Sequence, residues 1–77
     1  LDDTNYNAPF QLGNIFITQN EIFEALNWYL VALSNGEKEP AIHLKLADLY
    51  DKIGDEDMAE KHNKLAQKYK RNSKRKK

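Results

Sequence analysis

The sequence of 77 residues contains no cysteine, so neither a disulfide bond nor a thiolate-bound metal ion can hold its fold together. Long apolar runs are also missing, and the run from Trp28 to Leu33 is far shorter than the roughly 20 residues of a membrane-spanning helix. The first residues, Leu1-Asp2-Asp3, lack the basic start of a signal peptide. We therefore expect an intracellular protein, cytoplasmic or nuclear, that has no membrane partner.

Acidic residues are missing from the C-terminal end. All twelve lie between Asp2 and Glu60, where only three lysines oppose them and the net charge is −9. The segment from Lys61 to Lys77 holds nine basic residues and no acid. Because no apolar side chain anchors its last part, we predict a disordered basic tail over residues 72–77. The basic residues assigned to this end are Lys70, Arg71, Lys74, Arg75, Lys76 and Lys77.

Glycine and proline are scarce, and most of them stand where a helix would begin or end. Pro9 fits the first turn of one helix, and Pro40 is predicted to open another. Gly36 suits a left-handed residue after a helix, Gly54 ends the next helix, and Asp55 can cap the last one. Between these points apolar residues recur at helical spacing, and no segment alternates as a β-strand would. The expected fold class is all-α.

The sequence repeats itself with a period of about 34 residues. Small residues recur where two helices would cross, an aromatic residue recurs beside them, and a turn residue recurs between the helices. The matched pairs are Leu12 and Leu46, Gly13 and Ala47, Phe16 and Tyr50, Asn20 and Gly54, Ala25 and Ala59, and Ala32 and Ala66. A period of this length, made of helix, turn and helix, predicts two hairpins stacked as an α-solenoid.

At these positions the chain resembles the tetratricopeptide repeat family. Leu46-Ala47-x-x-Tyr50 has the family's spacing of small and aromatic residues, and Leu12-Gly13-x-x-Phe16 repeats it. Residues 25–50 are also similar to the related Sel1-type repeat. The resemblance implies one repeat domain over residues 1–71, with units of about 6–39 and 40–71.

Members of this family bind other proteins. The resemblance therefore implies a protein–protein interaction module, an adaptor or scaffold within a multi-protein complex, that binds another protein or peptide. In the family the first helix of each hairpin lines the binding groove. The matching positions here are Phe10, Asn14 and Ile17 in the first unit and Leu44, Lys45, Asp48, Asp51 and Lys52 in the second.

The sequence offers little for catalysis or for metal binding. It contains no glycine-rich phosphate loop, no nucleophile elbow and no H-x-x-x-H spacing. His43 and His62 fall on different predicted helices, and we interpret His43 as a core residue and not as a metal ligand. We expect no enzymatic activity, no metal and no cofactor.

The second predicted helix is unusually apolar, whereas its counterpart in the second unit is polar. Neighbouring residues cannot both face the same side of a helix, so either Trp28 or Tyr29 is expected to face outward. Together with Phe23 they form the candidate exposed interface. We expect upstream repeats to cover it, which would make this chain the C-terminal part of a longer repeat protein. Pairing with a second copy in a homo-oligomer is an alternative.

The basic end supports a different function. A lysine- and arginine-rich run can direct nuclear import or contact nucleic-acid phosphates, so the alternative is a nuclear or nucleic-acid-associated factor. The same run is equally compatible with a solvated end that has no function of its own. The identity of the partner and the pathway stay open at this point.

Overall fold

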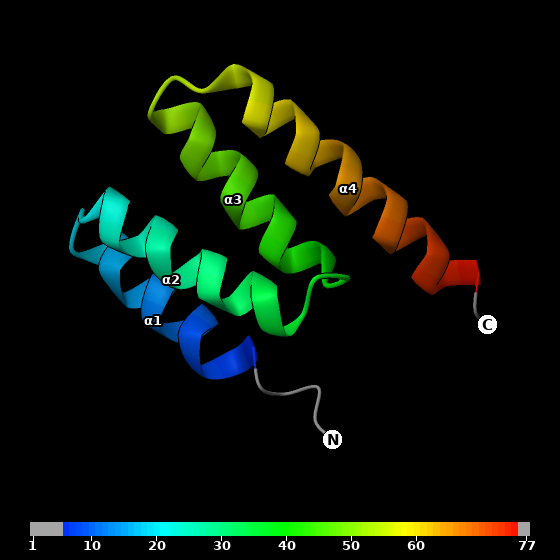
Figure 1. Ribbon diagram of the computed structural model, residues 1–77, viewed down its shortest axis with the longest axis horizontal. Coiled ribbons are helices and arrows are strands. Elements are labelled where there is room, and N and C mark those ends of the chain that lie inside the picture. Colours follow the sequence, from blue (N-terminus) through cyan, green and yellow to red (C-terminus); the bar gives the residue numbers. More distant parts are fainter. Residues whose placement is uncertain (1–5, 76–77) are drawn as a thin grey trace. The chain divides into compact units, whose positions relative to one another are not determined.

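The computed structural model describes residues 6–75, with the side chains of residues 6–70, and contains four helices and no strand within that range (Figure 1). The helices are α1 (Asn7–Thr18), α2 (Ile22–Asn35), α3 (Pro40–Lys52) and α4 (Glu56–Arg75). Helix α1 packs against α2, and α3 packs against α4, so the chain forms two helical hairpins. The prediction of an all-α fold made of helical hairpins is confirmed.

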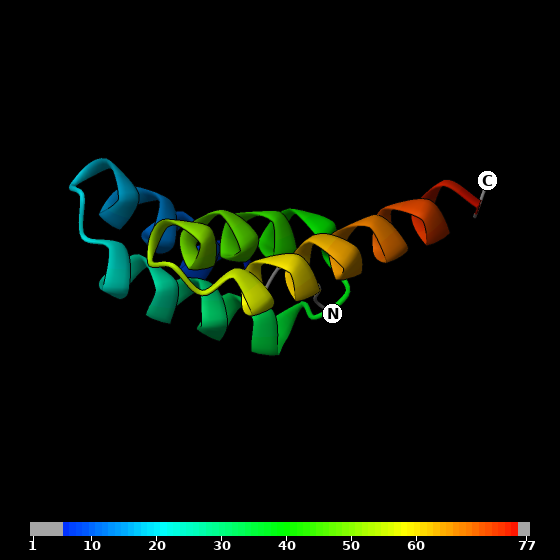
Figure 2. The same cartoon turned by 90° about the horizontal axis from the view of Figure 1, so that it is seen from above.

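Helix α4 is the longest of the four, and it continues past the start of α3 (Figure 2). The predicted disorder of the basic tail is therefore wrong for residues 72–75, which belong to this helix. Lysine and arginine have high helix propensity, and their positive charges are favourable near the negative C-terminal end of the helix dipole. Lys76 and Lys77 lie outside the described residues.

The two hairpin turns have the same hydrogen bonds at equivalent positions of the repeat. In the first turn, the backbone N–H of Glu21 donates to the carbonyl of Phe16 at 2.9 Å. In the second, the N–H of Asp55 donates to the carbonyl of Tyr50 at 2.8 Å. Such a bond across six residues closes the end of a helix and satisfies a carbonyl that has no partner within it.

One residue in each turn adopts the left-handed conformation that this closure requires. The φ angle is 64° at Asn20 and 89° at Gly54, and asparagine and glycine are the residues that accept this region most readily. Gly36 does not share this conformation, because its φ is −153°, so the prediction of a left-handed residue there is wrong. Glycine is needed at this position for space, since a β-carbon would lie 2.8 Å from the Cδ2 atom of Tyr6.

The starts of α3 and α4 agree with the sequence prediction. Pro40 occupies the first turn of α3, where its missing N–H costs no hydrogen bond. Asp55 precedes α4, and its Oδ1 atom accepts a hydrogen bond from the N–H of Met58 at 3.3 Å. The side chain thereby partners one of the free N–H groups at the start of the helix.

The first hairpin is held at the crossing of α1 and α2. A β-carbon added at Gly13 would lie 2.5 Å from Cε1 and 2.6 Å from Cδ1 of Tyr29, so the tyrosine ring lies directly on the glycine. The ring of Phe10 lies against the same ring, with centroids 5.4 Å apart. The Tyr29 hydroxyl donates a hydrogen bond to Oδ1 of Asn14. Tyr29 is thus held by α1 at both its ring and its hydroxyl.

The second hairpin uses alanine where its helices meet. Ala47 of α3 and Ala59 of α4 are both buried, which fits the predicted role of small residues at this crossing. The other buried residues of this hairpin are Ile42, His43, Leu46, Leu49, His62 and Ala66. Two of them are histidines, so the interior of the second hairpin contains ionisable groups.

We expect Gly13→Ala to destabilise the protein. The added methyl group would collide with a ring that has no free direction to move, at a typical overpacking cost of about 1–3 kcal/mol. Alanine would regain roughly 1 kcal/mol through its helix propensity, so we expect a net loss of up to about 2 kcal/mol. Urea unfolding monitored by circular dichroism measures it, with Gln11→Ala on the exposed side of α1 as control. A higher midpoint for Gly13→Ala than for the wild type would contradict this packing.

Candidate functional site

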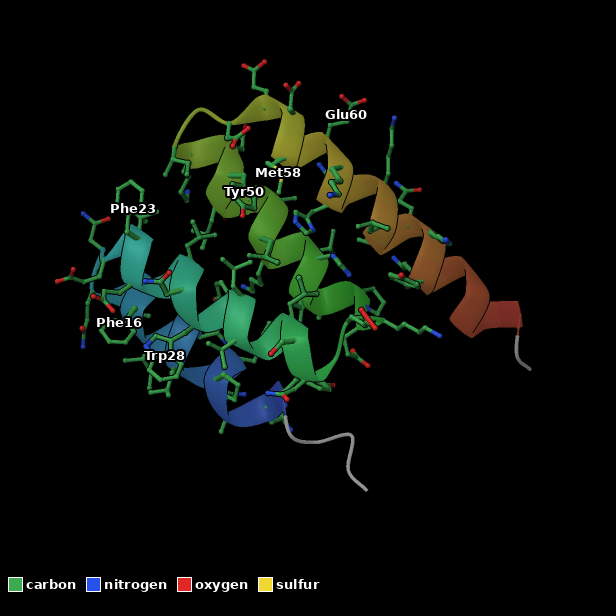
Figure 3. All side chains as sticks on the ribbon, in the orientation of Figure 1. Phe16, Phe23, Trp28, Tyr50, Met58 and Glu60 are labelled. Carbon is green, nitrogen blue, oxygen red and sulfur yellow. The ribbon has the colours of Figure 1, made fainter. Side chains whose placement is uncertain are left out.

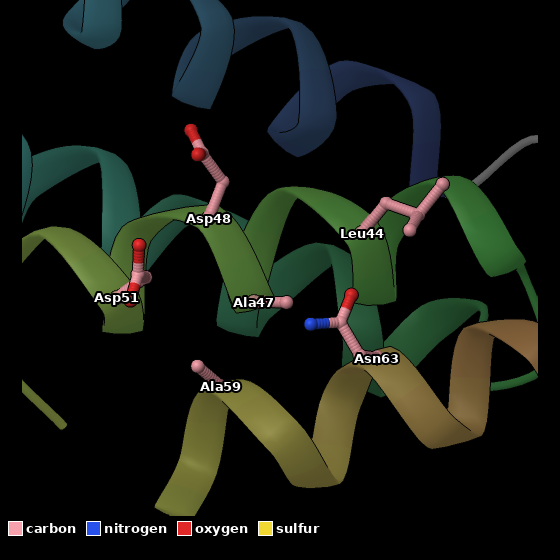
Figure 4. A pocket seen from close by; sticks show the side chains of 6 residues that line it. All are labelled: Leu44, Ala47, Asp48, Asp51, Ala59 and Asn63. Carbon is pink, nitrogen blue, oxygen red and sulfur yellow. The ribbon is translucent and has the colours of Figure 1, made fainter. Parts of the chain in front are cut away.

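A shallow hollow of about 400 Å³ lies between α3 and α4 (Figure 4). Ala47 of α3 and Ala59 of α4 supply small apolar surfaces, and the amide of Asn63 lies beside them. The hollow exists because these alanines fill so little of the space where the helices cross. The six residues that line it are Leu44, Ala47, Asp48, Asp51, Ala59 and Asn63.

Two carboxylates give the hollow a negative side. Asp48 and Asp51 both belong to α3 and both are exposed. The Nζ atom of Lys52 lies 4.0 Å from Oδ2 of Asp48, but this ion pair is long and exposed and therefore weak. The chemistry of the lining suits a ligand that combines a positively charged group with an apolar one.

Part of the predicted groove coincides in position with this hollow. Leu44, Asp48 and Asp51 were predicted groove residues, and they line the hollow. Lys45 and Lys52 are exposed on the same helix but do not line it. The residues that α4 contributes were not predicted, because the family pattern assigns the groove to the first helix of each hairpin. The sequence feature that could have indicated the contribution of α4 is the small residue Ala59.

The predicted groove residues of the first hairpin lie elsewhere, on α1. Phe10, Asn14 and Ile17 are half-buried, and none of them lines the hollow. Phe10 packs on the Tyr29 ring, and Asn14 accepts the tyrosine's hydroxyl hydrogen bond. These two residues therefore have a structural role inside the first hairpin, whatever further contacts they make.

The candidate exposed interface is corrected at one residue. Phe23 is 68% exposed and projects from the start of α2 (Figure 3). Trp28 is half-buried, whereas Tyr29 is completely buried and cannot contact a partner. Trp28 is thus the more exposed of the two neighbours. Val31 and Leu30 are the further exposed apolar residues on α2.

The most unusual contact in the described structure joins the two histidines. The Nδ1 atoms of His43 on α3 and His62 on α4 lie 2.9 Å apart, and the two rings stack with centroids 5.1 Å apart. The exposed fractions are only 3% and 4%. The ring of Tyr50 stacks on His62 at 5.6 Å, and the ring of Tyr69 stacks on His43 at 5.5 Å. Four rings thus fill this part of the interface.

The surroundings of His62 disfavour its charged form. Burial away from water lowers the pKa of His62 below the ordinary value of 6.5, and the nearby charges of His43 and Lys61 lower it further. All three causes act in the same direction. The imidazole therefore stays neutral to a lower pH inside the hairpin than it would in the unfolded chain.

His43 is a core residue, as predicted from the sequence, but its contact with His62 was not predicted. The antiparallel arrangement of the two predicted helices contained enough information to predict this contact. Once Ala47 is set opposite Ala59, a residue four positions earlier on α3 falls opposite one about four positions later on α4. Counting outward from the alanine crossing brings His43 level with His62.

Within the part of the chain that the structure describes, no group of three or more histidine, cysteine, aspartate or glutamate side chains could hold a metal ion. In the same part, none of the helices is both apolar enough and long enough to span a lipid bilayer. Comparison with known proteins found no matching family model, no matching curated protein and no matching solved structure.

The bond between Tyr29 and Asn14 generates a test of the structural role of Asn14. Asn14→Leu keeps a similar volume but removes the acceptor, so we expect a loss of about 1–2 kcal/mol in unfolding free energy. Asn14→Asp keeps an oxygen acceptor and should lose less. Urea unfolding of the two variants beside the wild type measures the difference. Equal stability of the leucine and aspartate variants would show that the bond contributes nothing.

Proposed function

We propose that this protein is a protein–protein interaction module whose hollow between α3 and α4 receives a segment of a partner protein. The observation that carries the proposal is the combination of two alanines at the helix crossing with Asp48 and Asp51 at the side of the hollow. No described group of residues has the arrangement of a metal centre. A shallow hollow of this kind fits recognition of another surface.

The lining defines the chemistry of the partner segment. Ala47 and Ala59 leave room for an apolar side chain, and the methyl groups of Leu44 extend this apolar surface. The two aspartates attract a lysine or arginine of the partner segment. This basic residue would lie one helical turn away from the apolar residue in a helical segment, or two residues away in an extended one. The partner segment therefore carries an apolar residue and a basic residue that lie close together on one face of the segment.

The repeat supports the same function. Helix α1 ends at Thr18 and α3 ends at Lys52, while α2 begins at Ile22 and α4 begins at Glu56. The turn in the second hairpin therefore follows the turn in the first by 34 residues. This is the same interval that separates the matched residues of the tetratricopeptide-like pattern. On this proposal the two hairpins stack as repeats of a scaffold, and further repeats or a second copy would cover the exposed apolar residues of α2, such as Phe23.

Selection of peptides from a random displayed library, followed by measurement of their Kd, tests the proposal. We expect enrichment of peptides with neighbouring apolar and basic residues. Asp48→Lys/Asp51→Lys should weaken their binding about tenfold or more, because two attractive charges become repulsive. The matched control is Glu24→Lys/Glu60→Lys, which makes the same change of charge at exposed residues outside the hollow.

Two results would count against the proposed site. One is a failure to enrich any peptide that the wild-type chain binds in solution. The other is equal weakening by the hollow variant and by its control, because general charge and not the hollow would then govern binding. Circular dichroism spectra of both variants confirm that the helices are retained.

The alternative, a nucleic-acid-associated factor, is favoured by one observation. Helix α4 carries exposed lysines, and it continues through Arg75 as a basic helix. The lysines with described exposed side chains are Lys61, Lys64, Lys68 and Lys70. Binding through phosphates would fall steeply with salt and would be lost on deleting residues 70–77. The variant Asp48→Lys/Asp51→Lys would not weaken it, which separates the two functions.

A further inference from the structure

The contact between His43 and His62 depends on how many protons the two imidazole rings carry. With both imidazoles neutral, one Nδ1 carries a hydrogen and donates it to the bare Nδ1 of the other across 2.9 Å. A first added proton need not break this contact, because a charged imidazole can still donate to a neutral one. A second added proton removes the last acceptor and sets two N–H groups and two positive charges against each other.

The hairpin leaves the pair little room to adapt to that second proton. Tyr50, from α3, is stacked on His62 with its ring within 4° of parallel, and Tyr69, from α4, is stacked on His43. Both histidines are almost fully buried, so water cannot replace the lost acceptor without movement of a helix.

A positive charge next to the pair acts against the second proton. Lys61, on α4, is next to His62 in sequence and acts on it through its charge. Lys68, also on α4, holds its ammonium group 5.8 Å from the centre of the Tyr69 ring, which stacks on His43. Tyr50 and Tyr69 contact the pair through their aromatic rings.

We propose that the His43–His62 contact makes the second hairpin acid-sensitive, so that a second proton on the pair separates α3 from α4. This regulation stands on the contact itself and does not depend on the proposed binding function. Mild acid, in the range where the carboxylates still carry their charge, is the condition that releases the contact.

The direction in which stability changes with pH follows from the difference in the pKa of His62 between the folded and the unfolded chain. The pKa of His62 is lowered in the folded hairpin, whereas in the unfolded chain it has its ordinary value of 6.5. The unfolded chain therefore binds more protons as the pH falls below about 6.5. The stabilising contribution is complete above that pH and is lost progressively as the pH falls toward the folded value. A histidine that stayed fully neutral in the hairpin would raise the unfolding equilibrium constant by at most about 25-fold between pH 7 and pH 5.

Urea unfolding of the full chain at pH 7 and at pH 5 tests the proposal. The chain contains only two histidines, and carboxylates titrate mainly below this range, so the change isolates the pair. We expect the unfolding constant of the wild type to rise several-fold, toward the limit of about 25-fold, when the pH is lowered. His62→Gln and His43→Gln each retain an amide that can bond to the remaining imidazole but cannot take up a proton. In both variants we expect less than half of the wild-type change.

A second measurement uses the wild type alone, so it tests the proposed acid sensitivity even if a variant fails to fold. The Cε1 proton resonance of His62, followed by NMR through the same pH range, should titrate below pH 6.5 in the folded protein. Signals of α3 and α4 residues around the pair should shift together with it, while those of α1 should not. Titration of His62 at or above 6.5, or a pH effect on unfolding that is equal in the wild type and in both variants, would overturn the proposal.

Discussion

Each hairpin depends on the way its chain reverses between two helices. A carbonyl in the last turn of the first helix accepts a hydrogen bond from the residue five positions later, and this bond closes only when the intervening Asn20 or Gly54 adopts a left-handed conformation. The closed turn restricts the register of the two helices. It therefore limits which side chains can face each other across a hairpin, and the packing of the helices decides which of them touch.

The consequences of this register differ between the hairpins. In the first, Tyr29 lies on Gly13 and is held by α1 through packing and a hydrogen bond. In the second, Ala47 and Ala59 line the hollow, while His43 meets His62 at the same helix–helix interface. The candidate binding site and the ionisable pair thus belong to one helix–helix interface, so a change in the separation of α3 and α4 affects both.

The histidine contact is a property of the second hairpin and not of the repeat. A shift by one repeat places Pro9 at the position of His43 and Trp28 at that of His62, and neither can take part in a proton-dependent contact. The resemblance between the units thus covers the turns and the small residues, which determine the backbone. The residues between them differ, and they give each hairpin its own interior.

The sequence by itself determined the four helices and most of their ends. Periodicity predicted four helices, Pro40 and Asp55 marked helix starts, and the internal repeat predicted the turns at Asn20 and Gly54, because these effects act between residues close together in the chain. Only the tertiary structure decided which of Trp28 and Tyr29 is buried, which residues of α4 complete the hollow, and that the two histidines touch. These outcomes depend on the rotation of each helix about its axis and on the distance between paired helices. Both are set by the packing of many side chains at once, which no single position in the sequence reveals.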